Sequence, residues 1–121
     1  MNVKSYRDLK VWQRGIGISK LTYKLVKDFP KDETYGLNSQ IRRCAISIPS
    51  NIAEGHARSY TKDFLRFLSI AQGSVAELET QLILAQEFKF GDNSKIQTLM
   101  NELDEVGRML NALKTSLSTN P

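Results

Sequence analysis

The feature that most constrains the fold of this 121-residue chain is an unbroken heptad spacing of apolar residues in its second half. The spacings are 4, 3, 4, 3, 4 and 3 between residues 64 and 85, and 4, 3, 4, 3 and 4 between residues 99 and 117. The positions are Phe64, Leu68, Ala71, Val75, Leu78, Leu82 and Ala85, then Leu99, Leu103, Val106, Leu110, Leu113 and Leu117. Two long helices with one apolar stripe each, joined by a short loop, pair as an antiparallel hairpin.

The first half of the chain predicts two further helices, over about residues 6–28 and 38–54. Two apolar stripes on the first of these indicate burial on more than one side. The stripes are Leu9, Trp12, Ile16, Tyr23 and Val26, then Val11, Ile18, Leu25 and Phe29. Gly15 and Gly17 weaken this helix by roughly 1 kcal/mol each, and such glycines can let another helix approach closely. Pro30 ends the helix, Asn38 is a good N-cap for the next one, and Gly55 is its C-terminal stop.

The second helix contains a proline in its middle. Pro49 removes a hydrogen bond to the Ala45 carbonyl, and an interior proline costs about 3 kcal/mol or more and usually kinks a helix. The helical spacing of Ile48 and Ile52 nevertheless continues across it. We therefore expect a kinked but continuous helix, in which the neighbouring Ser47 and Ser50 satisfy part of the freed backbone.

These segments predict an all-α fold: an antiparallel up-down-up-down four-helix bundle with its second helix kinked at Pro49. Its helices span about 6–28, 38–54, 60–88 and 94–117 within a single domain of residues 1–121. No run of 18 apolar residues and no signal peptide are present, so we expect a cytoplasmic protein without a membrane association.

Signatures of catalysis are absent from the sequence. With His56 as the single histidine, no imidazole pair can hold a metal, and neither a phosphate loop nor a nucleophile elbow is found. Cys44 lies twelve residues from His56 on or near one helix, too far for a nucleophile and its base. We expect no enzyme activity, no cofactor and no metal.

Charge is distributed unevenly along the chain. Residues 1–30 carry seven Lys or Arg against two Asp, whereas residues 67–121 carry four basic against seven acidic residues. On the first helix Arg7, Lys10 and Arg14 share a face, and Lys20 and Lys24 repeat that spacing. Such a face can contact phosphates of RNA or DNA without sequence preference, although it is also typical of a plain solvated surface or of pairing between the two halves of the chain.

A polar stripe on the second helix predicts a subunit interface. It is rich in amide, hydroxyl and guanidinium groups, which suit close packing better than a lysine- and glutamate-rich solvent face does. Its members are Gln40, Arg43, Ser47, Asn51 and Glu54. We expect Glu77 and Glu79 to pair with Arg42, Arg43 or Arg66 across the bundle or between subunits.

Several blocks together resemble one family. They are "DLKVW" at 8–12, "FP" at 29–30, "YGLNSQIRRCAISIPSNIAEG" at 35–55 and "FLRFLSIAQGSVAELETQL" at 64–82. These are similar to the four-helix-bundle proteins of 23S ribosomal RNA intervening sequences, a family that includes the accessory variability determinant of diversity-generating retroelements. The resemblance implies a barrel-like homopentamer without known enzyme activity. It also implies nucleic-acid contacts at Arg42, Arg43, Arg58 and Arg66, and a reverse transcriptase as partner where one is encoded nearby.

Two functions follow from these observations. The first is an oligomeric accessory protein that binds nucleic acid, RNA in particular, through its basic surface. The alternative is a structural or protein-interaction module whose basic residues only solvate the bundle. The five-fold number rests on the resemblance alone, because no spacing in the sequence distinguishes a five-fold from a four-fold ring.

Overall fold

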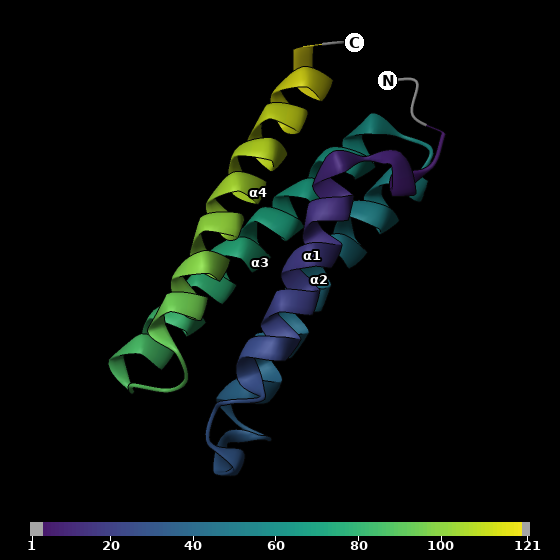
Figure 1. Ribbon diagram of the computed structural model, residues 1–121. Coiled ribbons are helices and arrows are strands. Elements are labelled where there is room, and N and C mark those ends of the chain that lie inside the picture. The colour runs from purple at the N-terminus through teal and green to yellow at the C-terminus, as the bar shows by residue number, and fades with distance from the viewer. Residues whose placement is uncertain (1–3, 120–121) are drawn as a thin grey trace.

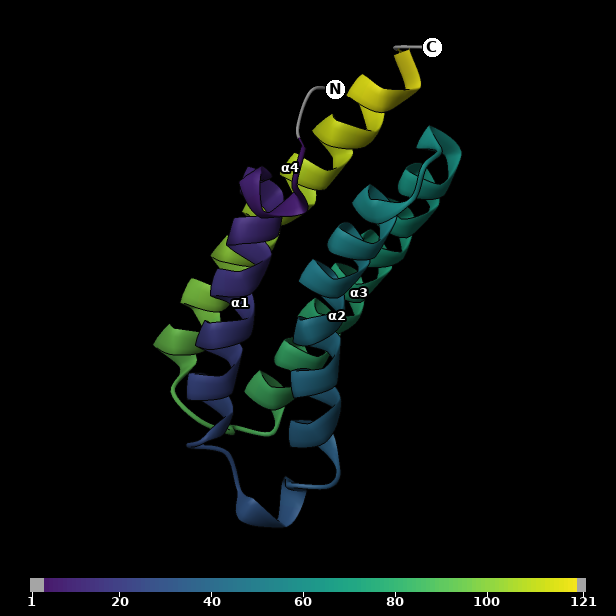
Figure 2. The ribbon, with the colours of Figure 1, turned by 90° about the vertical axis from the view of Figure 1, so that its right-hand side faces the viewer.

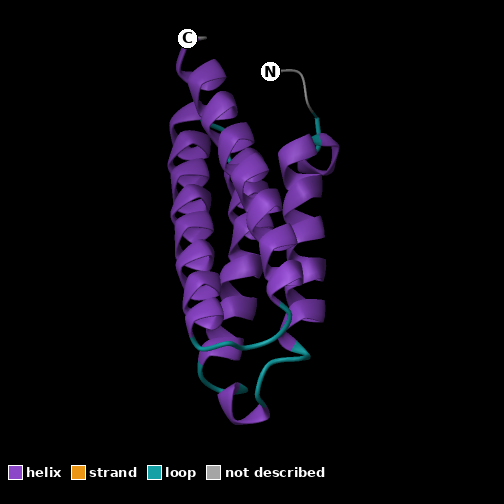
Figure 3. Cartoon of the chain, turned by 60° about the vertical axis from the view of Figure 1, so that its left-hand side comes forward, coloured by secondary structure: helices purple, strands orange, loops and turns teal. Residues whose placement is uncertain are grey.

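The computed structural model describes residues 4–119 and contains four long helices (Figure 1). They are α1 (Lys10–Val26), α2 (Leu37–Ala57), α3 (Thr61–Glu87) and α4 (Asn93–Thr119). Two single-turn 3-10 helices, η1 (Tyr6–Asp8) and η2 (Lys31–Glu33), precede α1 and α2. Helices and loops make up the whole of this described part of the chain (Figure 3). The predicted all-α fold is therefore confirmed.

The helices pack in the cyclic order α1, α2, α3 and α4, so each one contacts the two beside it. The α1–α2 and α3–α4 connections lie at one end of the bundle, and the α2–α3 connection lies at the other end (Figures 1 and 2). The first described residues and the end of α4 lie at the same end as the α2–α3 connection. Segments from three parts of the sequence therefore meet at that end.

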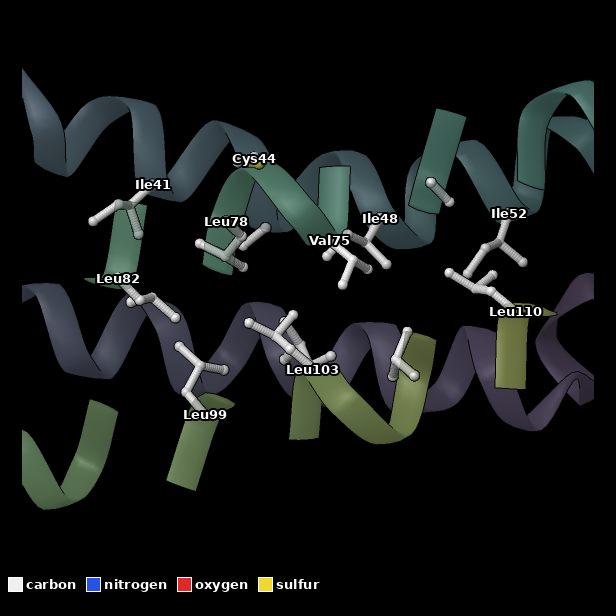
Figure 4. Packing of buried hydrophobic residues seen from close by; sticks show 14 of the residues in the cluster. Ile41, Cys44, Ile48, Ile52, Val75, Leu78, Leu82, Leu99, Leu103 and Leu110 are labelled. Carbon is white, nitrogen blue, oxygen red and sulfur yellow. The ribbon is translucent and has the colours of Figure 1, made fainter. Parts of the chain in front are cut away.

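The heptad positions of α3 and α4 form the core (Figure 4). Their leucines, among them Leu78 and Leu103, meet isoleucines of α2 such as Ile48 and are completely buried. Burying one such side chain contributes about 1.5–3 kcal/mol. Leu113 and Leu117, near the end of α4, are half-buried. The spacing thus identified the inward face of both helices correctly.

Helix α1 buries only one of its two apolar stripes completely. The stripe that begins at Val11 packs into the core, whereas Ile16 and Tyr23 of the other stripe are exposed. The helix also begins later than expected, because Leu9 adopts an extended conformation (φ −76°, ψ 123°) that separates η1 from α1. The Ser5 hydroxyl accepts the Arg7 N–H at 3.1 Å and so caps the short turn.

Helix α2 is continuous through Pro49, as expected, and the bend of its axis there stays a prediction. Pro49 packs against α1 at Gly15, where a methyl group on the glycine would lie 3.2 Å from the proline Cβ. Pro49 has no N–H to donate to the Ala45 carbonyl. That carbonyl instead accepts a hydrogen bond from the Ser19 hydroxyl of α1 at 3.2 Å. The expectation that Ser47 and Ser50 serve this carbonyl is thus wrong: Ser47 bonds elsewhere, and α1 supplies the donor.

Both predicted ends of α2 need correction. The helix begins at Leu37, whose N–H is accepted by the Glu33 carboxylate at 3.2 Å. Asn38 is already inside the helix, where it is buried and donates to the Pro30 carbonyl at 3.2 Å. Gly55 does not stop the helix, because α2 continues to Ala57. A Cβ on this glycine would lie 2.6 Å from the Cβ of Phe67, so its role is to let α3 approach.

The α3–α4 connection folds back onto the end of α1. Phe90 packs against Phe29 with ring centroids 5.9 Å apart. Gly91 has a φ of +68°, and a side chain there would collide with the Phe29 ring. Asp92 then accepts the Ser94 N–H at 2.9 Å, which caps the start of α4.

Candidate nucleic-acid interface

All the charged residues on the exposed face of α1 are basic. The helix contains four basic residues, Lys10, Arg14, Lys20 and Lys24, and no acidic residue. All four side chains are exposed. At neutral pH this face therefore presents only positive charge from its own helix, which favours contact with phosphates.

Arg14 is the member of this face that is engaged by another helix. Its guanidinium forms an ion pair with Glu102 of α4 at 3.0 Å, across a groove with hollows of about 280 and 420 Å³ between the two helices. A second carboxylate of α4, Glu105, bonds to Arg108 at 2.9 Å, and this contact lowers the pKa of Glu105. The α4 side of the groove is thus acidic, and we exclude Arg14 from the group of unopposed cations.

Two other predicted contact residues have structural partners. The Arg7 guanidinium lies 5.5 Å from the centre of the Tyr6 ring, and Tyr6 in turn packs edge-on against Trp12. Arg42 is half-buried, donates to the Thr34 carbonyl at 3.4 Å and lies over the Tyr23 ring at 6.0 Å. Arg42 of α2 therefore contacts both the α1–α2 connection and α1.

The other three predicted arginines are exposed. Arg43 lies on the outer face of α2. Arg58 and Arg66 come together around one aromatic ring, because their guanidinium carbons lie 5.0 and 4.5 Å from the centre of Phe67. Arg58 also pairs with Glu54 at 2.9 Å. The structure thus brings two arginines, separated by eight positions in the sequence, to the junction of α2 and α3.

Tyr60 is a candidate contact residue that the sequence prediction did not include. It immediately precedes α3, its side chain forms no capping hydrogen bond, and it is 72% exposed. The signal that would have drawn attention to it is the alternation of basic and aromatic residues in 56–67. Stacking aromatics between cations are typical of proteins that bind single strands.

The predicted interface stripe on α2 does not face outward as one surface. Ser47 donates to Ser74 of α3 at 2.6 Å, and Asn51 donates to the Ser47 carbonyl at 2.7 Å. These two side chains belong to a line of polar contacts inside the bundle, which we call the polar seam. Gln40, Arg43 and Glu54 remain exposed. The stripe is split because the small Ser74 lets α2 and α3 pack closely at this point.

Cys44 lies on the same seam. Its thiol contacts the Ser74 carbonyl at 3.0 Å and the Glu77 carboxylate at 3.6 Å. Burial, followed by the charge of Glu77, raises the pKa of Cys44 to about 12. A thiol of this kind stays protonated and is a poor nucleophile.

The two glutamates expected to pair with arginines have other neighbours. Glu77 lies beside Cys44, and Glu79 lies beside Asp104 of α4. Burial raises the pKa of Glu79, and Asp104 raises it further through a hydrogen bond and through its charge. None of the four ion pairs between described residues joins these glutamates to Arg42, Arg43 or Arg66. The expectation is therefore wrong within the chain, and pairing between subunits stays a prediction.

Residues 4–119 contain neither a metal-binding cluster nor a membrane span. In this region no three His, Cys, Asp or Glu side chains are grouped so that they could hold a metal ion. No helix in the same region is long and apolar enough to cross a bilayer.

Comparison with known proteins agrees with the fold. Residues 7–112 match the family described as 23S rRNA-intervening sequence protein. A crystal structure of a protein of unknown function from the S23 ribosomal protein family of Bacteroides thetaiotaomicron VPI-5482 is similar, with a TM-score of 0.80 and 22% identity. The similarity covers 87% of this chain and 95% of that chain. No curated protein matches. Because the family match spans most of the sequence, the chain belongs to the 23S rRNA-intervening sequence protein family.

Proposed function

We propose that this protein is a non-enzymatic accessory factor that binds nucleic acid, RNA in particular, through the basic face of α1. The observation that carries the proposal is the charge of α1, which has no acidic residue and, besides the ion-paired Arg14, three exposed lysines. Phosphate contacts need only positive charge and reach, so this face binds without reading sequence. Where a reverse transcriptase is encoded beside the gene, we propose it as the protein partner.

Binding of a generic RNA across a salt series tests this proposal. A phosphate-driven complex loses affinity steeply between about 50 and 200 mM salt, because binding releases condensed counterions. We expect the double variant Lys10→Glu/Lys20→Glu to weaken binding at least tenfold and to flatten the salt dependence. Arg14 is left unchanged because a glutamate there would face Glu102.

The matched control carries the same change of charge outside α1. Lys31→Glu/Lys89→Glu alters two exposed lysines in the α1–α2 and α3–α4 connections. We expect it to bind RNA nearly as well as the parent protein. If both double variants lose affinity equally, net charge and not the α1 face controls binding. If the parent protein binds no RNA at about 50 mM salt, the proposal is wrong.

A second candidate function, assembly of the protein with itself, has its own observation. Apolar side chains are exposed on several helices: Ile16 and Tyr23 of α1, Ile46 of α2, and Ile70, Ile83 and Leu84 of α3, the helix diagonal to α1 in the bundle. Different apolar surfaces on one chain suit a head-to-tail contact, which closes into a ring when the rotation allows. On this basis we propose a homo-oligomer. The number of five subunits comes from the family resemblance.

Light scattering tests assembly directly. We expect a mass several times the 13.7 kDa of one chain. Ile83→Glu, which places a charge on the apolar face of α3, should shift the protein towards the monomer. Asn111→Glu changes an exposed polar residue of α4 and should leave the mass unaltered. A parent protein that stays monomeric at high concentration would rule out assembly and leave the proposal for nucleic acid intact.

A further inference from the structure

The junction of α2 and α3, which we call the α2–α3 corner (residues 54–67), combines three features suited to an unpaired nucleotide. The first is Tyr60, whose ring is 72% exposed although no side-chain hydrogen bond to the start of α3 requires it there. An exposed aromatic face is a platform on which any base can stack, because every base has a π-face. Tyr35, in the α1–α2 connection, is the other highly exposed tyrosine.

The second feature is the pair of guanidinium groups. Arg58 and Arg66 approach Phe67, which is itself buried, at 5.0 and 4.5 Å. Because Phe67 is held in place by its burial, the two guanidinium groups that lie against its ring have few orientations. They therefore lose less conformational freedom when they bind a phosphate. The ion pair of Arg58 with Glu54 is exposed on both sides, and such pairs contribute only about 0–1 kcal/mol. Arg58 can therefore exchange the carboxylate for a phosphate.

The third feature is a hollow of about 180 Å³ beside Tyr60. Its wall includes the hydroxyl-bearing Ser59 and Thr61 and, from the last turns of α4, Leu117. Pockets that enclose a whole small molecule measure about 300–1,000 Å³, so this hollow suits one flat group of a longer chain. Hydroxyl groups and an aliphatic side chain in the same lining match a base with polar edges and an apolar face.

The corner also adjoins the start of the basic face of α1. The short helix η1 packs against α2, and the first turn of α1 follows it at the same end of the bundle as the corner (Figure 1). Arg7 of η1 and Lys10 of α1 therefore lie at the same end of the bundle as the corner. A duplex cannot place a base on Tyr60 without unpairing it, which costs a few kcal/mol.

We propose that the α2–α3 corner binds an unpaired nucleotide of a single strand, with its base stacked on Tyr60 and the flanking phosphates held by Arg58 and Arg66. This inference rests on the proposed function and names the form of nucleic acid that is bound. It makes the protein selective for single strands, loops or ends over continuous duplex.

Three fluorescein-labelled ten-nucleotide probes test the inference by anisotropy: a single strand, the same strand in a duplex, and the same strand with abasic sites. At equal salt we expect the single strand to bind tighter than either other probe. Tyr60→Ala should weaken its binding about 5- to 100-fold, to the level of the abasic strand. The salt slope should stay the same, because no charge is lost.

Two variants control for structure. Tyr60→Phe keeps the stacking face and should retain most of the affinity, and Tyr35→Ala removes the other highly exposed tyrosine and should change nothing. Tyr60→Ala with unchanged single-strand affinity, or equal binding of intact and abasic strands, would overturn the inference while leaving the phosphate-binding proposal standing. Absence of binding to all three probes at about 50 mM salt would overturn both.

Discussion

The hydroxyl of Ser19 in α1 donates to the carbonyl oxygen of Ala45 in α2 at 3.2 Å, and this is the oxygen that Pro49 leaves without a helical partner. The same hydroxyl lies 3.2 Å from the Gly15 carbonyl of its own helix, so its single proton is shared between two acceptors. One helix thus repairs a hydrogen-bond defect in another. The repair explains how a helix can continue through a proline in its interior.

We expect Ser19→Ala to destabilise the fold by about 1–3 kcal/mol, because it leaves a buried carbonyl without a donor. Urea unfolding followed by circular dichroism measures the change. Ser69→Ala, at an exposed position of α3, is the control and should stay within about 0.5 kcal/mol of the parent protein.

A double-mutant cycle with Pro49→Ala assigns the effect to the carbonyl. An alanine at position 49 restores the N–H that bonds to Ala45, so the loss of the Ser19 hydroxyl should then cost less. Equal costs of Ser19→Ala in both backgrounds would show that the hydroxyl does not compensate for the proline.

We expect Gly15→Ala and Gly17→Ala to have opposite effects. A Cβ on Gly15 would lie 3.2 Å from the Pro49 Cβ and 3.4 Å from its Cα, and neither atom can yield easily within a buried helix. The cost of overpacking outweighs the gain in helix propensity, so the free energy of unfolding of this variant should fall by about 0.5–2 kcal/mol. A Cβ on Gly17 would have no neighbouring atom within 4 Å, and the free energy of unfolding of that variant should rise by about 0.5–1 kcal/mol. Thermal unfolding of the two variants side by side gives the comparison.

Glu79 makes the stability of the bundle depend on pH. Burial and the neighbouring Asp104 raise its pKa in the folded state, so the folded protein binds this proton more tightly than the unfolded chain does. The contribution of Glu79 therefore favours folding at low pH and is lost as the pH rises through the raised pKa.

We expect Glu79→Gln to raise the Tm at pH 7 and to have a smaller effect near pH 4, because the stabilising contribution of the raised pKa is retained at low pH. In an Asp104→Asn background the gain at pH 7 should shrink, because one cause of the raised pKa has been removed. Scanning calorimetry at the two pH values measures this. A Tm that falls at pH 7 in Glu79→Gln would show that the charged carboxylate stabilises the fold.

We expect Cys44 to resist thiol reagents in the native protein. With a pKa of about 12, its thiolate fraction at pH 8 is on the order of 10³-fold below that of an ordinary thiol. Ellman's reagent should react slowly with the native chain and quickly in urea. Glu77→Gln removes only the second cause of the shift and should speed native labelling modestly. Labelling as fast in the native protein as in urea would contradict the buried position of the thiol.

The inward faces of α3 and α4 could be predicted because heptad spacing depends on one helix alone. The partners of Ser19 and Ser47 could not, because they depend on the register between neighbouring helices, which no spacing within a single helix reveals. Ser47 was placed correctly on its helix, but its direction was set by the small Ser74 across the seam. Gly55 suggests a helix end when only its backbone freedom is considered, whereas the nearness of Phe67 requires a glycine inside the helix.

The same limit applied to the candidate interface. The basic face of α1 was visible in the sequence because its residues share one helix. Arg14 differed from its neighbours only through Glu102, which lies 88 positions later. Tyr60 gained its surroundings only when the ends of α2, α3 and α4 came together.

The contact of Gly15 with Pro49 and the bond from Ser19 to Ala45 together lock α1 against α2. A slide by one helical turn, about 5.4 Å, would bring a residue with a side chain against the proline ring and withdraw the donor from the unpaired carbonyl. A sliding motion between α1 and α2 is therefore unfavourable. Opening between α1 and α4 meets no such interlock: there the apolar core is supplemented by two exposed ion pairs, Arg14 with Glu102 and Asp28, just after α1, with Lys95.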